Sequence, residues 1–166
     1  MKQKRLWLMC GIPGSGKSTW AKRKVEQTGG VWISRDAIRF SILKDDEDYF
    51  SHEDEVLAKF FSDVQEQLNN PMVEDIIVDA SHLSAKARQT TLGQLNLTNA
   101  TEINCVMLDV PVATAIERND QREGRAKVPH SVIRRMDIQK TFPTKEEKFT
   151  RIIRVDAEGK ESEVNL

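Results

Sequence analysis

Cysteine and histidine are scarce in this chain of 166 residues, which has two of the first and three of the second. Cys10 and Cys105 lie in separate apolar segments rather than in paired metal-ligand spacings, and the histidines are scattered. The sequence therefore contains no zinc motif, and we expect both cysteines to be buried core thiols.

A long apolar run is also missing. The basic start of the chain, residues 1–5, is followed by a short apolar segment that leads straight into a glycine-rich loop. Such a segment is too short for a secretory signal peptide or a membrane span. We therefore expect a cytoplasmic protein with no membrane partner.

An excess of either charge is absent, because 25 Lys and Arg residues stand against 26 Asp and Glu residues and give a net charge of −1. Global charge thus does not indicate nucleic-acid binding, and a nucleic-acid partner would need a local basic patch. The sequence has no internal repeat, low-complexity tract or long linker. We expect a single domain over residues 1–166.

A phosphate-binding loop is the strongest motif present. The segment Gly11-Ile12-Pro13-Gly14-Ser15-Gly16-Lys17-Ser18-Thr19 fits the pattern G-x-x-x-x-G-K-[ST]. It follows an apolar strand and opens a helix that we expect from Lys17 toward Gln27. Its glycines let backbone N–H groups surround a polyphosphate. We expect Lys17 to reach the β- and γ-phosphates of ATP and the Ser18 hydroxyl to bind Mg²⁺.

Short apolar segments alternate with helical patterns along the chain. Strands are expected at Arg5–Cys10, Val31–Ser34, Asp75–Asp79, Ile103–Asp109 and Arg151–Val155. Helices are expected at Glu53–Asn69 and, with Ser84 as N-cap, at Ser84–Leu95. The alternation predicts an α/β fold with a parallel sheet of four to five strands flanked by helices. Ligands of such sheets bind at the carboxyl ends of the strands.

A second group, from Ser34 to Arg39, ends the second expected strand and therefore lies at the same sheet edge as the loop. Asp36 and Arg39 are three residues apart, which places both on one helical face. Asp36 could accept the proton of an attacking hydroxyl group while Arg39 holds an anionic part of the acceptor. Alternatively, Asp36 caps the helix and Arg39 pairs with a nearby carboxylate.

The strand Asp75–Asp79 also ends on a carboxylate, the pattern of the motif whose Asp organises Mg²⁺ in many nucleotide-binding proteins. Many strands end on Asp for turn chemistry alone, and Asp79 could instead orient Arg39 through a hydrogen bond. We take Asp79 as a candidate substrate-binding and metal-binding residue beside Ser18.

Basic residues gather in residues 117–130, which we expect to form a lid over the phosphates. Arg118 and Arg122 are four residues apart, which predicts one helical face, and Gly124 is expected to break that helix before Arg125. Arginines on a mobile segment can neutralise a transferring phosphoryl group and exclude water. The alternative is an ordinary solvated basic helix. The acidic residues 45–48 and 53–55 favour a solvated loop and helix start.

Together these motifs resemble the kinase domain of phage-type 5′-polynucleotide kinases. The resemblance spans about residues 1–136 and includes the loop, the Ser34 to Arg39 group, Asp109-Val110-Pro111, Glu117-Arg118-Asn119 with Arg122, and Val128-Pro129. It implies a P-loop kinase fold that transfers the γ-phosphoryl group of ATP, with Mg²⁺, to the 5′-hydroxyl end of single-stranded DNA or RNA.

The resemblance also implies roles for single residues. Lys17 and Ser18 would handle phosphates and Mg²⁺, and Asp36 would be the general base. Arg39 would hold a phosphate of the acceptor strand. Arg118 and Arg122 would contact the donor phosphates, and Asp79 occupies the position of a functional carboxylate.

The sequence departs from the bifunctional relatives because it has no Asp-x-Asp-Gly-Thr phosphatase motif, which implies a kinase alone. Its lid is slightly longer between Arg122 and Pro129, which leaves the use of Arg125 open. Other P-loop kinases phosphorylate nucleosides, sugars or antibiotics, so a small-molecule kinase is an alternative that the near-zero net charge favours. A nucleotide-gated binding module is a third reading, but nothing in it would require Asp36.

Overall fold

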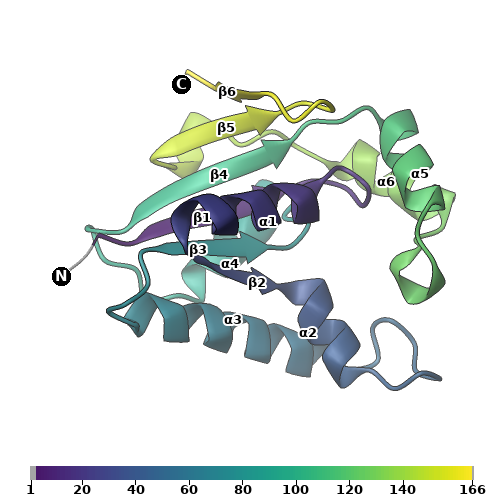
Figure 1. Cartoon of the computed structure of the whole chain (residues 1–166), viewed down its shortest axis with the longest axis horizontal. Helices are drawn as coiled ribbons and strands as arrows, with labels where there is room; N and C mark the ends of the chain where they lie inside the picture. The colour runs from purple at the N-terminus through teal and green to yellow at the C-terminus, as the bar shows by residue number, and fades with distance from the viewer. Residues whose placement is uncertain (1–2, 166) are drawn as a thin grey trace.

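The computed structural model describes residues 3–165, and its centre is a six-stranded sheet in the order β2-β3-β1-β4-β5-β6 (Figure 1). The strands are β1 (Arg5–Cys10), β2 (Val31–Ser34), β3 (Asp75–Asp79), β4 (Glu102–Leu108), β5 (Arg151–Val155) and β6 (Glu161–Glu163). The first five run parallel, as the alternating sequence pattern predicts, and β6 pairs antiparallel with β5 at the edge.

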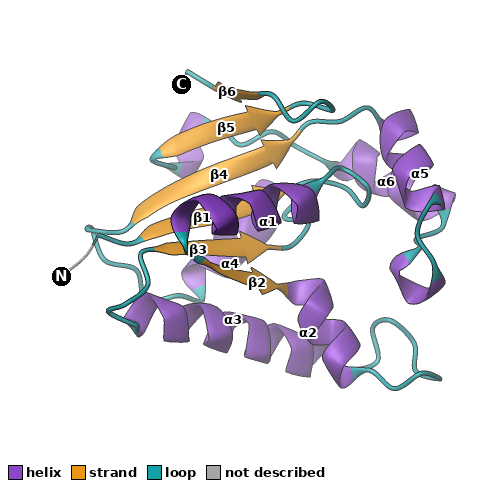
Figure 2. Ribbon diagram, in the orientation of Figure 1, coloured by secondary structure: helices purple, strands orange, loops and turns teal. Residues whose placement is uncertain are grey.

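Helices connect the parallel strands and cover the sheet (Figure 2). They are α1 (Lys17–Thr28), α2 (Arg35–Ile42), α3 (Glu53–Asn69), α4 (Ala85–Gly93), α5 (Val112–Asp120) and α6 (His130–Gln139), with short 3₁₀ turns at Gly124–Ala126 and Lys145–Glu147. Ser84 caps α4 as expected, because its hydroxyl accepts a hydrogen bond from the Ala87 N–H at 3.1 Å.

Alternation along β1 builds one core on each face of the sheet. Leu6 and Leu8 pack with Phe60 of α3 in one cluster, whereas Trp7 packs with Trp20 of α1 in the other. Both faces of a parallel sheet are thereby buried, which explains why its central strands are apolar throughout. The buried Cys10 and Cys105 confirm the expectation of core thiols.

Parallel pairing brings the ends of distant segments to one edge of the sheet. Ser34, the last residue of β2, and Met9 of β1 both pair with Asp79 at the end of β3. The loop that follows β1 and the start of α2 therefore lie beside Asp79. This edge is the carboxyl end of the strands, where the fold places its ligands.

The segment after α5 differs from the sequence expectation. The helix ends at Asp120, so Arg122 lies beyond it and does not share a helical face with Arg118; the expected break at Gly124 is wrong. The buried Asn119 side chain explains the early end, because its amide bonds both the N–H and the carbonyl group of Val128, at 2.9 and 2.7 Å. These two bonds fold the chain back and close the segment into a loop.

Candidate active site

The loop between β1 and α1 depends on two glycines in left-handed conformations, Gly14 at φ 82° and Gly16 at φ 97°. A Cβ atom on Gly14 would lie 2.2 Å from the carbonyl oxygen of Ala115, so the loop packs directly against α5. Gly16 is the N-cap of α1, whose first turn leaves N–H groups without partners inside the helix. These N–H groups and the helix dipole suit a polyphosphate.

Lys17, the first residue of α1, folds its side chain back over the loop. Its Nζ donates to the carbonyl oxygens of Gly11 and Ile12, at 2.9 and 3.2 Å. Burial lowers the pKa of Lys17, against the opposing effect of the Asp79 and Asp36 carboxylates. A cation held by neutral carbonyl groups is available to a phosphate without breaking an ion pair.

A cavity of about 900 Å³ opens at this edge of the sheet. All of the predicted site residues line it except Gly11 and Ser15, which are buried behind it. The Ser15 hydroxyl has no hydrogen-bond partner, and the Gly11 N–H donates to the carbonyl group of Ser81 at 2.9 Å. The sequence thus predicted which segments meet at the cavity.

Asp36 and Arg39 lie side by side on α2, but Arg39 is not free for a ligand. Its side chain is only 1% exposed, whereas that of Asp36 is 62% exposed. Arg39 Nη1 donates to Asp36 Oδ1 at 2.8 Å, and Nη2 donates to Glu53 Oε2 at 2.5 Å. This is the carboxylate pairing named as the alternative for Arg39. Its contact with an acceptor phosphate stays a prediction.

Asp79 is 6% exposed and faces the Lys17 ammonium rather than Arg39. Its Oδ2 accepts a hydrogen bond from the Trp32 indole at 2.9 Å, so the alternative in which it bonds Arg39 is not the one observed. Burial raises the pKa of Asp79, against the lowering effects of Lys17 and Trp32. Lys17 and Trp32 therefore offset only part of the cost of burying this carboxylate, and a divalent cation bound to it would offset the rest.

The arginines of the predicted lid occupy different positions. Arg118 reaches past the loop to the turn after β5, where Nη2 donates to the Ala157 carbonyl oxygen at 2.6 Å. Arg122 is exposed and lines the cavity. Arg125 donates to the carbonyl oxygen of Lys44 at 3.0 Å, so the lid segment contacts the loop between α2 and α3. In Figure 1 the segment after α5 and the loop between α2 and α3 lie on the same side of the molecule.

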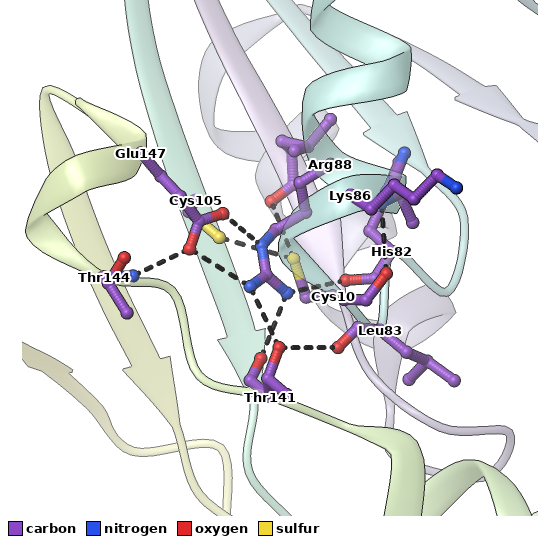
Figure 3. A network of polar contacts seen from close by, with 12 residues as sticks. Cys10, His82, Leu83, Lys86, Arg88, Cys105, Thr141, Thr144 and Glu147 are labelled. Atoms are coloured by element: carbon purple, nitrogen blue, oxygen red, sulfur yellow. Dashed lines mark hydrogen bonds and ion pairs between the residues drawn. The ribbon is translucent and has the colours of Figure 1, made fainter.

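A polar network that the sequence did not predict is centred on Arg88 (Figure 3). Buried Arg88 of α4 donates to Glu147 Oε1 at 2.7 Å, and to the carbonyl oxygen of His82 at 2.9 Å. His82 Nδ1 lies 2.8 Å from the Met9 carbonyl oxygen, two residues before the loop begins. Burial lowers the pKa of His82 to about 3, so the ring is neutral and donates this bond. No local motif marks these residues, because their partners come from distant segments.

Metal ligands of the usual clustered kind are missing from the described part of the chain, where no group of three His, Cys, Asp or Glu residues could hold an ion. Mg²⁺ does not need such a cage, since it binds through one or two protein oxygens, phosphates and water. Within residues 3–165, no helix has the length and apolar character needed to cross a bilayer.

Comparison with known proteins supports the kinase fold. A sugar kinase from Janibacter sp. HTCC2649 matches at 19% identity and TM-score 0.64, over 94% of this chain and 86% of that chain. A chain of the Pnkp1/Rnl/Hen1 RNA repair complex matches at 24% identity and TM-score 0.70, over 84% of this chain and 44% of that one. A fungal RNA kinase matches at 12% identity and TM-score 0.67, over 93% of this chain and 75% of that chain.

These neighbours share with this chain an α/β fold in which helices flank a mostly parallel sheet. The AAA domain family model matches residues 6–143, which include the loop, Asp36, Asp79 and the lid segment. The chain therefore belongs to the AAA domain family.

Proposed function

We propose that the protein transfers the γ-phosphoryl group of ATP to the 5′-hydroxyl end of a DNA or RNA strand, as the phage-type polynucleotide kinases do. One observation carries the proposal: Lys17 of the phosphate loop and the exposed carboxylate of Asp36 line the same cavity. Donor phosphates and an acceptor hydroxyl group could thus meet between them.

The donor half of the cavity consists of the loop N–H groups, Lys17 and the lid arginines. In the reaction, the acceptor oxygen forms a bond to the γ-phosphorus while the bond from that phosphorus to the β,γ-bridging oxygen breaks. Lys17, Arg118 and Arg122 would neutralise the charge that builds on the leaving phosphates. The Arg118 bond to Ala157 holds that side chain beside the loop before ATP arrives.

Mg²⁺ would be held by the Ser18 hydroxyl group and the Asp79 carboxylate, with the phosphates and water completing its coordination. The ion would offset the negative charge of the phosphate oxygens. The Trp32 indole fixes Asp79 Oδ2, and the exposed Ser18 side chain lines the cavity from the first turn of α1.

The acceptor half contains Asp36, which would take the proton of the attacking hydroxyl group. Its side chain is exposed to the cavity, whereas the neighbouring Arg39 is buried and neutralised by two carboxylates. Arg35 and Lys127 also line the cavity and could contact the first phosphates of a strand.

A small-molecule kinase, acting on a nucleoside, sugar or antibiotic, is the second candidate. It is favoured by the net charge of −1 and by the ion pairs of Arg39 with two carboxylates. Neither feature provides a row of free basic side chains that could bind the phosphates of a strand. The sugar kinase among the structural neighbours has the same fold.

The deciding experiment measures transfer from labelled ATP to 5′-hydroxyl oligonucleotides, nucleosides and sugars in parallel. Phosphorylation of an oligonucleotide end by the wild-type protein, and its loss in the Asp36→Asn variant, is the expected result. Transfer to a nucleoside or sugar with none to any oligonucleotide would establish the second candidate instead.

A further inference from the structure

Tyr49 is the single tyrosine of the chain and lies in the loop between α2 and α3. Its hydroxyl group donates to Asp36 Oδ1 at 2.6 Å and accepts a hydrogen bond from Arg39 Nη1 at 2.8 Å. Asp36 Oδ1 therefore receives two donors, Tyr49 and Arg39, and within residues 3–165 no hydrogen bond engages Oδ2. Two hydrogen bonds thus hold one carboxylate oxygen, while the Asp36 side chain as a whole is 62% exposed.

The Tyr49 ring is itself held in place. It lies over the Arg39 guanidinium at 4.1 Å from ring centroid to Cζ, and it makes edge contacts with Phe40 and Phe50. Glu53, the first residue of α3, holds the other side of the guanidinium. We call these four polar residues, Asp36, Arg39, Tyr49 and Glu53, the Tyr49 cluster.

The charges of the cluster explain why the hydroxyl group matters. Arg39 carries one positive charge between two carboxylates, so its attraction is shared and cannot fix Asp36 alone. The Tyr49 hydroxyl is a directed donor that bonds Asp36 and not Glu53. Burial and the bond to Asp36 raise the pKa of Tyr49, so it remains a donor throughout the neutral range.

We propose that Tyr49 is a positioning residue for Asp36: it fixes Oδ1 so that Oδ2 is presented to the acceptor hydroxyl group. The inference rests on the proposed function only in taking Asp36 as the base. It applies equally to a strand end or a small molecule as acceptor. Arg39 and Glu53 then serve to hold the tyrosine and its ring.

The test uses Tyr49→Phe, which keeps the ring contacts and removes only the oxygen. We expect kcat for transfer to fall about tenfold or more, because a hydrogen bond to a charged group is stronger than one between neutral groups. The KM for ATP and slow ATP hydrolysis should stay within twofold of wild type. Glu55→Gln, an exposed change two residues from Glu53, is the matched control and should leave kcat unchanged.

A double-variant measurement distinguishes positioning from general loosening. If Tyr49 acts through Asp36, Tyr49→Phe should cost nothing further in the Asp36→Asn background. A tenfold loss in both backgrounds, or no loss in either, would overturn the proposal. Normal transfer by Asp36→Asn alone would instead remove Asp36 as the base and overturn the proposed mechanism.

A measurement without any Tyr49 variant tests the contact itself. Because the chain has one tyrosine, tyrosinate absorbance during alkaline titration reports Tyr49 alone. Tyrosinate should form at lower pH in the folded Asp36→Ala protein than in wild type, since the carboxylate opposes ionisation. Identical titration curves would contradict the contact.

Discussion

Arg39 illustrates how far a residue's neighbourhood alters its chemistry. The buried Arg39 guanidinium pairs with two carboxylates, those of Asp36 and Glu53. Removing either carboxylate would destabilise the protein, because part of the buried positive charge would then lack a partner. The Nε of Arg39 is also buried without a hydrogen-bond partner. This arrangement suits a residue that organises its neighbours, and an acceptor phosphate would have to displace Asp36 or Glu53 to bind it.

Asp36 is the residue on which the proposed chemistry depends most. Asp36→Asn should lower kcat by roughly two orders of magnitude or more, because the amide cannot take the hydroxyl proton. ATP affinity should stay within a few fold, since the proposed role of Asp36 is toward the hydroxyl proton and not toward ATP. Steady-state kinetics and ATP titration check this, and turnover near the wild-type rate would exclude Asp36 as the base.

Substitutions of Arg39, Arg118 and Arg122 should affect phosphoryl transfer and ATP hydrolysis differently. Arg118→Ala and Arg122→Ala should impair both transfer and slow ATP hydrolysis, because both reactions release the same phosphates. Arg39→Ala should impair transfer much more than hydrolysis, since it supports only the acceptor side. Parallel assays of the two reactions decide, and equal losses in all three variants would contradict the division.

His82 should make folding stability depend on acid. Its pKa is lowered from 6.5 to about 3 in the folded state by burial, and by the charges of Arg35, Arg88 and Lys17, against the bond to Met9. Between these two pKa values His82 is protonated in the unfolded state and neutral in the folded state. The free energy of unfolding therefore decreases as pH falls from about 6.5 toward 3. The loss is about 1.4 kcal/mol per pH unit.

Denaturant unfolding between pH 6.5 and 5 measures this slope before most carboxylates titrate. His82→Gln, which can still donate toward Met9 and accept from Thr91, should flatten the slope. A slope unchanged by the substitution would show that another group titrates in this range.

At the scale of elements, the phosphate loop and α5 form one unit. The contact of Gly14 with Ala115 places the loop against the helix that carries Arg118. Arg125 joins the lid segment to the loop after α2. The proposed donor and acceptor halves are thus connected through α5 and the segment that follows it.

Two glycine variants test the first of these contacts. Gly14 and Gly29 both have left-handed backbones, but a Cβ on Gly29 would meet nothing within 4 Å. Gly29→Ala should cost about 1 kcal/mol of stability and leave ATP affinity unchanged. Gly14→Ala should weaken ATP binding at least about tenfold, since the loop must move away from α5. Equal ATP affinity in the two variants, measured by calorimetry, would refute the packing argument.

The elements were the most predictable part of the molecule. Four of the five expected strands have the expected bounds, and β4 is shifted by one residue. Short apolar runs that end at turns leave little choice of where a strand begins and ends. The edge strand β6 has only three residues, all of them polar and exposed, so it has no apolar signal. The end of α5 depends on an Asn119 amide reaching Val128, and Glu53 and Tyr49 meet Arg39 only after the loop after α2 folds back. Such tertiary contacts leave no local pattern.

At the scale of the whole molecule, near neutrality limits how a strand could be held. Arg35, Arg122 and Lys127 supply local positive charge at the cavity, whereas the acidic residues 45–48, all exposed except the half-buried Glu47, lie on the loop between α2 and α3. Only a few phosphates next to the reacting end can be neutralised by such a site.

Affinity for strands should therefore depend weakly on salt and length. The slope of log K against log salt should be roughly −1 to −3 in total, at about −0.7 for each phosphate contacted on a single strand. KM for a ladder of 5′-hydroxyl oligonucleotides, measured at two salt concentrations, should stop falling within a few nucleotides. Continued tightening over many nucleotides would refute binding at the strand end.

The two thiols offer a use unrelated to the reaction. Cys10 and Cys105 are fully buried on neighbouring strands, with 3.3 Å between their sulfur atoms. An alkylating reagent needs an accessible thiolate, so it can react only when β1 and β4 separate. The rate of labelling then reports how often the centre of the sheet opens, in the manner of hydrogen exchange. Since Cys10 directly precedes the phosphate loop, the slowing of that rate by a bound nucleotide would measure how strongly ligand and sheet are coupled.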